Sequence, residues 1–141
     1  MPYTTTPVLT QPDPRDIDFI EARLIEYNIQ TTGYDDGELL ALITRDEVGQ
    51  IVAGLSGFTW GGACKVEWLW VREDLRGQGL GHDLMAQAEA EAIRRGCQTI
   101  LLDTHSFQAP GFYHKLGFEI VGVYQDFPKG HQQVCLQKRL G

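Results

Sequence analysis

A glycine-rich loop between two regular segments constrains the fold of this chain more than any other feature. The loop, REDLRGQGLG, follows a strand-like stretch that ends at Val71 and precedes a helix expected from His82. Its three glycines allow a tight turn and a close backbone approach to a ligand; they are Gly77, Gly79 and Gly81. At a helix N-terminus, unpaired N–H groups and the positive end of the helix dipole favour an anion. With the fixed charge of Arg76, the pattern predicts a pyrophosphate site over Arg76–Gly81.

Two common phosphate-binding loops are excluded by the residues that follow the glycines. A P-loop ends in Gly-Lys-Ser/Thr, whereas Gly81 is followed by His82 and Asp83. The dinucleotide fingerprint GxGxxG would start at Gly77 and require a small residue where His82 stands. The glycines alone are equally consistent with a tight strand-to-helix turn that binds nothing.

The remaining pattern predicts a mixed α+β fold with one central sheet. Helices are expected over 17–27, with Asp16 as N-cap, and over 82–95 and 110–115; strands are expected over 39–44, 51–60, 65–71, 99–104, 119–124 and 133–137. The first strands form an antiparallel meander. A helix joins the strand before the glycine loop to the strand after it, which favours a parallel pair. We therefore expect a single mixed sheet flanked by helices, in one domain over residues 1–141.

Composition and charge exclude several classes of protein. No apolar run approaches the roughly 18 residues of a membrane span, and the N-terminus lacks a signal-peptide pattern. Three cysteines without CxxC spacing and four histidines without ligand spacing predict a reduced, cytoplasmic protein with no metal. The net charge of −7 argues against nucleic acid. Residues 1–50 hold ten acidic and three basic side chains, so this half is either a solvated acidic surface or the lining of a pocket for a cation.

Two segments resemble the signatures of one enzyme family, the GNAT acyl-CoA N-acyltransferases. Residues 71–81 resemble its cofactor motif, Arg/Gln-x-x-Gly-x-Gly/Ala, through Arg76, Gly79 and Gly81. About thirty residues further on, APGFYHKLGF over 109–118 resembles the second signature, an Ala followed by Phe/Leu-Tyr-x-Lys-x-Gly-Phe. The resemblance covers about residues 35–141 well and the first helix more loosely, and it implies a GNAT fold and an N-acetyltransferase that uses acetyl-CoA as cosubstrate.

The resemblance also implies a role for individual residues. The pyrophosphate would be held by the backbone amides of Arg76, Gly77, Gln78, Gly79, Leu80 and Gly81. Main-chain groups of Leu69 and Val71 would pair with the pantetheine arm as an added strand does. Tyr113 matches the general acid that protonates the departing thiolate. Where the family often has an Asn that contacts the pantetheine, this chain has Ser106, whose hydroxyl is the expected substitute.

A base for the acceptor amine is less clearly marked than the acid. Glu67 precedes Leu69 and Val71 by two and four residues, so strand periodicity predicts that all three share one face. Glu67 is accordingly our first candidate for the general base, with His131 and Asp103 as alternatives, although an exposed strand glutamate without a catalytic role fits the sequence equally well. A backbone N–H near 69–71 is expected to stabilise the oxyanion.

The acceptor itself cannot be read from the motifs. A small-molecule primary amine is the leading prediction; a protein N-terminus or lysine is an alternative acceptor, and a non-catalytic coenzyme A sensor is an alternative function. Candidate pocket residues, chosen by location, are Tyr27, Tyr34, Asp35, Asp36 and Trp60, whereas Trp68 and Trp70 are expected in the core. Terminal strands in this architecture often pair between subunits, so a homodimer is a further expectation.

Overall fold

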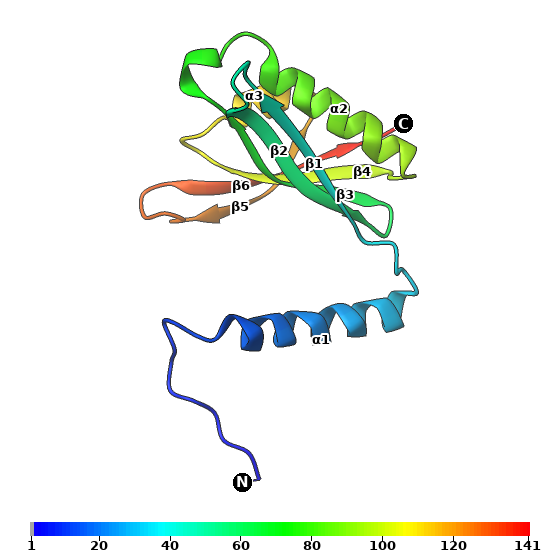
Figure 1. Cartoon of the computed structure of the whole chain (residues 1–141), viewed down its shortest axis with the longest axis vertical. Helices are drawn as coiled ribbons and strands as arrows, with labels where there is room; N and C mark the ends of the chain where they lie inside the picture. The colour runs from blue at the N-terminus through cyan, green and yellow to red at the C-terminus, as the bar shows by residue number, and fades with distance from the viewer. Residues whose placement is uncertain (1) are drawn as a thin grey trace. The chain divides into compact units, whose positions relative to one another are not determined.

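The computed structural model describes residues 2–141, which form two compact units divided between Asp35 and Asp36 (Figure 1). The N-terminal unit contains one helix, α1 (Pro14–Thr32). The second unit contains the sheet and the remaining helices. A single domain over 1–141 stays a prediction.

Helix α1 begins earlier and ends later than its apolar spacing predicted. Asp13 is the N-cap, and Pro14 occupies the first turn, where its missing N–H costs nothing. The prediction of Asp16 as N-cap is therefore wrong; Asp16 lies inside the first turn, where its charge suits the helix dipole. The helix ends at Gly33, which adopts φ 78° and donates its N–H to the Ile29 carbonyl.

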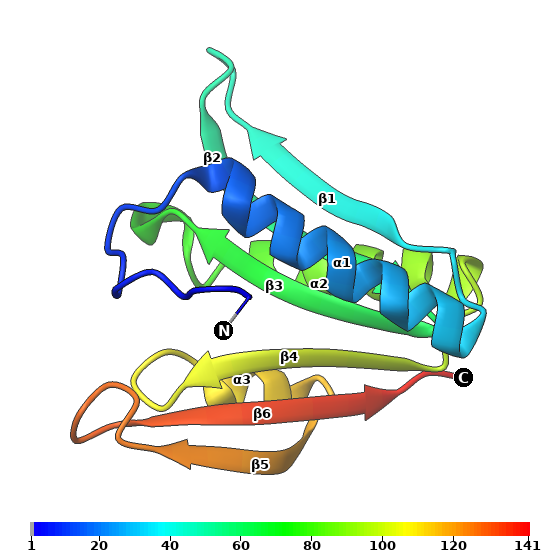
Figure 2. The same ribbon diagram turned by 90° about the horizontal axis from the view of Figure 1, so that it is seen from below.

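The second unit is built on one six-stranded mixed sheet, which confirms the predicted α+β class. Its strands are β1 (Glu38–Arg45), β2 (Ile51–Trp60), β3 (Ala63–Val71), β4 (Thr99–His105), β5 (Glu119–Gln125) and β6 (Gln132–Arg139). They lie in the order β1-β2-β3-β4-β6-β5, and only β3 and β4 are parallel. The helical segments are η1 (Glu73–Leu75), α2 (Leu80–Arg94) and α3 (Pro110–Lys115), with α2 and α3 on the same side of the sheet (Figure 2).

Helix α2 covers one face of the sheet and closes the core. Its buried side chains are the four that the helical spacing predicted, Leu84, Met85, Ala88 and Ala92. Alanine at two of these positions lets the helix approach β1, β2 and β3 closely. The largest fully buried side chains beneath it include Phe118, Leu55 and Ile100. No helix within residues 2–141 combines the length and the apolar character needed to cross a bilayer.

Candidate active site

Strands β3 and β4 diverge in the middle of the sheet, so that main-chain groups of the two strands are no longer paired with each other there (Figure 2). Their parallel pairing ends at Val66 and Leu102, although β3 continues to Val71 and β4 to His105. We call the diverging residues, 67–71 of β3 and 103–105 of β4, the fork. Over these residues neither strand is a ladder partner of the other, so a ligand with its own amides can pair there.

A β-bulge in β3 accounts for the divergence. On β2, Gly57 pairs with Val66 and Ser56 pairs with Trp68, so Glu67 is an extra residue without a partner. A bulge of this kind bends its strand and increases the local twist. The bulge requires glycine at position 57, because a Cβ on Gly57 would lie 2.1 Å from the Lys65 carbonyl oxygen.

The direction of the β3 main chain in the fork follows from one hydrogen bond. The N–H of Arg72 donates to the Val52 carbonyl on β2 at 2.8 Å. Because successive residues of a strand direct their main-chain groups to opposite sides, Leu69 and Val71 direct theirs away from β2 and into the fork. The Val71 carbonyl accepts the Arg76 Nε–H at 2.9 Å, so the main-chain groups of Leu69 and the N–H of Val71 are the ones left for a ligand.

The glycine loop adopts the conformation that its sequence predicted. Gly77 and Gly79 have φ of 76° and 90°, and a Cβ at either position would meet open space. Gly79 is the N-cap of α2, which begins at Leu80, two residues before the expected start. The first-turn N–H groups therefore open toward the loop, and among residues 2–141 no carboxylate pairs with Arg76. Arg76 and the first-turn N–H groups are the positive groups that this loop offers to an anion.

The third loop glycine joins the loop to the fork and to α3. A Cβ at Gly81 would lie 3.4 Å from Phe112 Cζ and 3.9 Å from Val71 Cγ2. The N-terminus of α2 is thus packed against the end of β3 and against the helix that carries Tyr113.

Tyr113 combines a buried ring with a hydroxyl that no residue within 2–141 engages. The residue is 9% exposed, and Phe112 and Phe118 pack edge-on against its ring at centroid distances of 5.1 and 5.9 Å. Burial raises the pKa of the phenol above its ordinary value, so the group stays protonated at neutral pH. Nothing in the described part of the chain hydrogen-bonds to this hydroxyl, which leaves its proton free to donate.

Ser106 has a structural contact that limits what its hydroxyl can do. Its Oγ accepts the Gln132 N–H at 3.0 Å, and its own N–H donates to the Gln132 carbonyl at 2.8 Å. These bonds tie the end of β4 to the start of β6. The hydroxyl hydrogen remains available, so a contact with the pantetheine stays a prediction.

The bulge overturns the predicted face of Glu67. Val66 and Leu69 are three residues apart, yet both pack in the core, because the extra residue interrupts the alternation. Glu67 is exposed and does not share the face of Leu69 and Val71. The same shift places Trp68 and Trp70 on the surface of this unit, 74% and 48% exposed, so the prediction that they are core residues is wrong.

Glu67 and Asp103 occupy equivalent places at the base of the fork. Each is the first residue after the last paired residues of β3 and β4, Val66 and Leu102. Asp103 lies opposite Cys135 of β6. Burial, and then the neighbouring Asp103 carboxyl group, raise the pKa of the Cys135 thiol.

An aromatic and histidine cluster at the end of β4 was missed by sequence reasoning. The ring of His105 stacks on Phe107 with centroids 5.3 Å apart, and Phe127 meets it edge-on at 5.4 Å. His131, one of the alternative bases, touches Phe107 edge-on at 5.0 Å. The four residues come from the end of β4 with the loop after it and from the β5–β6 connection, 20 residues or more further along the chain, and no local pattern in the sequence marks their contact.

The predicted acceptor-pocket residues fall into both units. Tyr27, Tyr34 and Asp35 belong to the N-terminal unit, so their role stays a prediction. Asp36 accepts the Gly61 N–H at 2.9 Å and, with Trp60, lines a cavity of about 260 Å³ beside the C-terminal end of α2.

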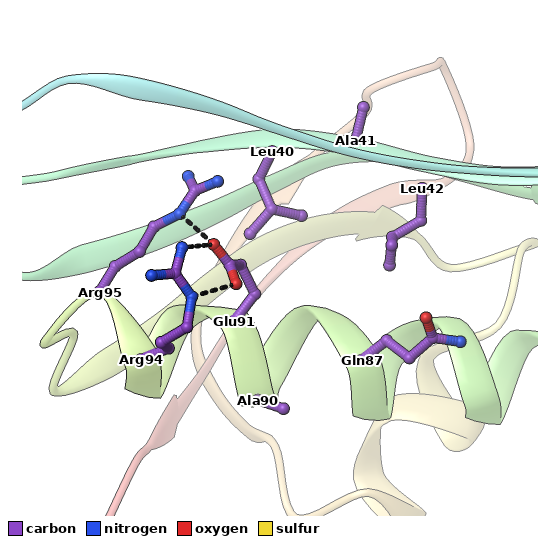
Figure 3. Close-up of a pocket in the computed structure, with 8 residues that line it drawn as sticks. All are labelled: Leu40, Ala41, Leu42, Gln87, Ala90, Glu91, Arg94 and Arg95. Atoms are coloured by element: carbon purple, nitrogen blue, oxygen red, sulfur yellow. Dashed lines mark hydrogen bonds and ion pairs between the residues drawn. The ribbon is translucent and has the colours of Figure 1, made fainter.

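A larger groove lies between α2 and the edge strand β1 (Figure 3). It measures about 520 Å³ and is lined by Leu40, Ala41, Leu42, Gln87, Ala90, Glu91, Arg94 and Arg95. Neither this groove nor the smaller cavity includes a residue of the fork or of the glycine loop. Among the described residues no group of three His, Cys, Asp or Glu side chains is placed to hold a metal ion.

Comparisons with known proteins agree with this geometry. Residues 36–120 match the family model of the acetyltransferase (GNAT) domain. The chain is 34% identical over 116 residues to an acetyltransferase of Agrobacterium fabrum, covering 82% of this chain and 85% of the relative. It is 38% identical over 104 residues to the blasticidin-S acetyltransferase of Streptomyces morookaense, covering 73% of this chain and 76% of the relative. An acetyltransferase structure from Bacillus cereus superposes with a TM-score of 0.82 at 35% identity, over 95% of this chain and 98% of that one. The chain therefore belongs to the GNAT acetyltransferase family and is an acyltransferase.

Proposed function

We propose that the protein transfers the acetyl group of acetyl-CoA to a primary amine of a small molecule. The observation that carries the proposal is the packing of Gly81 against Val71 and Phe112, since it unites an anion site, an open strand edge and a buried phenol. The relative named blasticidin-S acetyltransferase supports a small-molecule acceptor rather than a protein.

In this proposal the cosubstrate lies along the fork. The N–H groups of Arg76–Gly81 and the charge of Arg76 hold its pyrophosphate, with Gly77, Gln78, Gly79 and Leu80 contributing backbone amides. The main chain of Leu69 pairs with the amides of the pantetheine arm, with Val71 and Ser106 beside it. An N–H of this strand also donates to the thioester oxygen, where negative charge develops during attack.

The amine must lose a proton before it can attack. An alkylamine with a pKa near 10.4 costs about 4–5 kcal/mol to deprotonate at neutral pH, so a base at the fork accelerates the reaction. After attack, the C–S bond breaks and the Tyr113 hydroxyl protonates the departing thiolate, which is a poorer leaving group without that proton.

The test is release of free thiol from acetyl-CoA in the presence of a panel of amines. The panel contains blasticidin S, polyamines, aminoglycosides and peptides with a free N-terminus or lysine. Turnover with a small amine supports the proposal, and turnover with peptides alone replaces it by protein acetylation. Binding of acetyl-CoA without turnover on any amine would indicate a coenzyme A sensor.

Two further expectations accompany the proposal. A cytoplasmic location fits three cysteines that form no disulfide, Cys64, Cys97 and Cys135. A homodimer fits the position of β5 at the edge of the sheet, where Ile120, Val121 and Tyr124 are each 60% exposed. Light scattering of the purified chain tests the dimer directly, and a monomer at micromolar concentration would contradict it.

A further inference from the structure

His105 is held in one orientation at the end of β4. Its Nδ1 lies 2.9 Å from the Phe127 carbonyl oxygen, and the ring is parallel to Phe107 within 9° and meets Phe127 at 87°. A carbonyl oxygen only accepts hydrogen bonds, so Nδ1 carries the hydrogen and Nε2 of the neutral ring has a free lone pair. The contacts thus select both the tautomer and the position of this imidazole.

The free nitrogen is directed away from the β5–β6 connection. Phe127 belongs to that connection, and the two ring nitrogens of an imidazole point in nearly opposite directions. In the sheet order, β4 separates β6 from β3, and the fork lies on the β3 side of β4. His105 also shares a face with Asp103, two residues earlier, because Leu102 and Thr104 are buried toward α2.

The other candidate bases lack one or more of these features. His131 touches only the edge of Phe107, and no hydrogen bond within residues 2–141 orients its ring. Glu67 is exposed on the bulge, without an ion pair or hydrogen bond to any described residue. A free carboxyl titrates near 4 and a free imidazole near 6.5, so imidazole is the stronger base for an amine at neutral pH.

We infer that His105 is the general base that takes the proton of the acceptor amine. The inference rests on the acetyl transfer proposed above. The amine attacks in its neutral form, after its first proton has gone to solvent. As its nitrogen forms a bond to the acetyl carbonyl carbon, Nε2 accepts the second proton from that nitrogen, directly or through one water. The C–S bond then breaks, and the thiolate takes the hydroxyl proton of Tyr113. Solvent carries a proton from the imidazolium to the Tyr113 phenolate, which restores both groups.

The pH dependence of kcat/KM is influenced by the charged groups around His105 as well as by the imidazole itself. The titratable or charged side chains on the elements around it include Asp103 on β4, Cys135 on β6, Tyr124 on β5, Lys65 and Glu67 on β3, and Asp126, Lys129 and His131 in the β5–β6 connection. Of these, Asp103 shares its strand and face, and His131 shares its contact with Phe107. We expect kcat/KM to rise with pH as the substrate amine loses its first proton, and to show a separate limb at lower pH that depends on His105.

The test is the pH–rate profile of His105→Asn. The Asn side-chain amide can still donate to the Phe127 carbonyl, so the anchor is kept while the basic nitrogen is removed. We expect kcat/KM for the amine to fall by about 10²-fold, the imidazole limb to disappear and the KM for acetyl-CoA to stay unchanged. His131→Gln is the matched comparison in the same cluster and should keep the limb, and near-equal unfolding temperatures would show that both variants are folded.

Two outcomes would overturn the inference while leaving the acetyl transfer intact. One is an active His105→Asn enzyme with the wild-type limb. The other is loss of rate and limb in Glu67→Gln or Asp103→Asn but not in His105→Asn. A wild-type protein that acetylates no amine would instead overturn the transfer reaction itself, and the role of His105 with it.

Discussion

At the scale of single residues, removal of the Tyr113 hydroxyl should lower the catalytic rate without changing the stability of the fold. Since no described residue bonds to it, Tyr113→Phe should leave the unfolding temperature nearly unchanged. We expect kcat to fall by about 10²-fold, with little change in the KM for acetyl-CoA. Steady-state kinetics measure both. Turnover at the wild-type rate would remove Tyr113 from the mechanism.

The pH dependence of Tyr113 has a defined sign. Burial raises the pKa of the phenol, and the protonated form is the one that donates. Its contribution is therefore present at neutral pH and is lost only as pH rises through this raised value. In a kcat–pH profile we expect no decline assignable to Tyr113 below pH 10, and a decline near neutrality that is absent in Tyr113→Phe would contradict this.

The loop glycine Gly79 tests the anion site. Gly79→Val should abolish acetyl-CoA binding, because the side chain would fill the open space where the backbone meets the ligand. Valine is also strained at φ 90°, so the matched control is Gly49→Val, at φ 87° in the β1–β2 turn and likewise facing open space. Calorimetric titration should show binding to the Gly49 variant alone, and equal affinity in both would refute the site.

At the scale of elements, the bulge in β3 determines where the fork opens. Gly57→Ala places a Cβ 2.1 Å from the Lys65 carbonyl oxygen, so the β2–β3 pairing must shift. We expect a loss of about 1–3 kcal/mol in the free energy of unfolding and a higher KM for acetyl-CoA. Gly122→Ala in β5, where the nearest atom lies 4.0 Å away, is the control for urea denaturation. Equal stability of the two variants would show that the bulge tolerates a side chain.

The C-terminal end of α2 is tied to the sheet through Glu91. This carboxylate accepts from Arg94 and Arg95 (Figure 3). Arg95 also donates to the Thr59 hydroxyl and the Glu38 main-chain carbonyl. The two guanidinium groups, first Arg94 and then Arg95, lower the pKa of Glu91 from 4.5 to about 2. A lowered pKa contributes stability that is complete above about pH 4.5 and is lost as pH falls toward 2.

Glu91→Gln should therefore be less stable than the wild type at pH 7. The difference in unfolding temperature between the two proteins should become smaller between about pH 4.5 and pH 2, where the wild-type carboxyl becomes protonated. Thermal unfolding across this range measures it, with Glu47→Gln in the exposed β1–β2 turn as control. A difference that stays constant with pH would mean that the ion pairs contribute nothing.

At the scale of the whole molecule, a bound cosubstrate should stabilise the sheet-containing unit. Acetyl-CoA at about 100 times its Kd adds about 2.7 kcal/mol, which raises the unfolding temperature by several degrees. Coenzyme A should give a similar shift, because in the proposed complex the loop and the fork hold the parts that the two molecules share. No shift with either ligand would mean that Arg76–Gly81 is only a turn.

Local pattern was sufficient for much of the fold. The buried face of α2 was predicted at Leu84, Met85, Ala88 and Ala92, and the bounds 51–60 and 110–115 were predicted without error. The parallel pairing of β3 and β4 followed from the helix between them. These features depend on periodicity and chain connection, which a single sequence contains.

The errors share one physical cause. The predicted faces of Glu67, Trp68 and Trp70 assumed unbroken alternation, and the bulge opposite Gly57 breaks it. Whether a strand takes an extra residue depends on its partner, here on a glycine ten residues earlier that admits the Lys65 carbonyl. The contact of His105 with Phe127 likewise joins segments that are 22 residues apart in the chain.

By itself the sequence determined the elements, the glycine loop before α2 and the family of the chain, because each depends on residues close together in the chain. Only the tertiary structure decided where β3 leaves β4, which main-chain groups face the fork and which nitrogen of His105 is free. Those features arise from pairing and packing between distant segments, whose geometry no local pattern encodes.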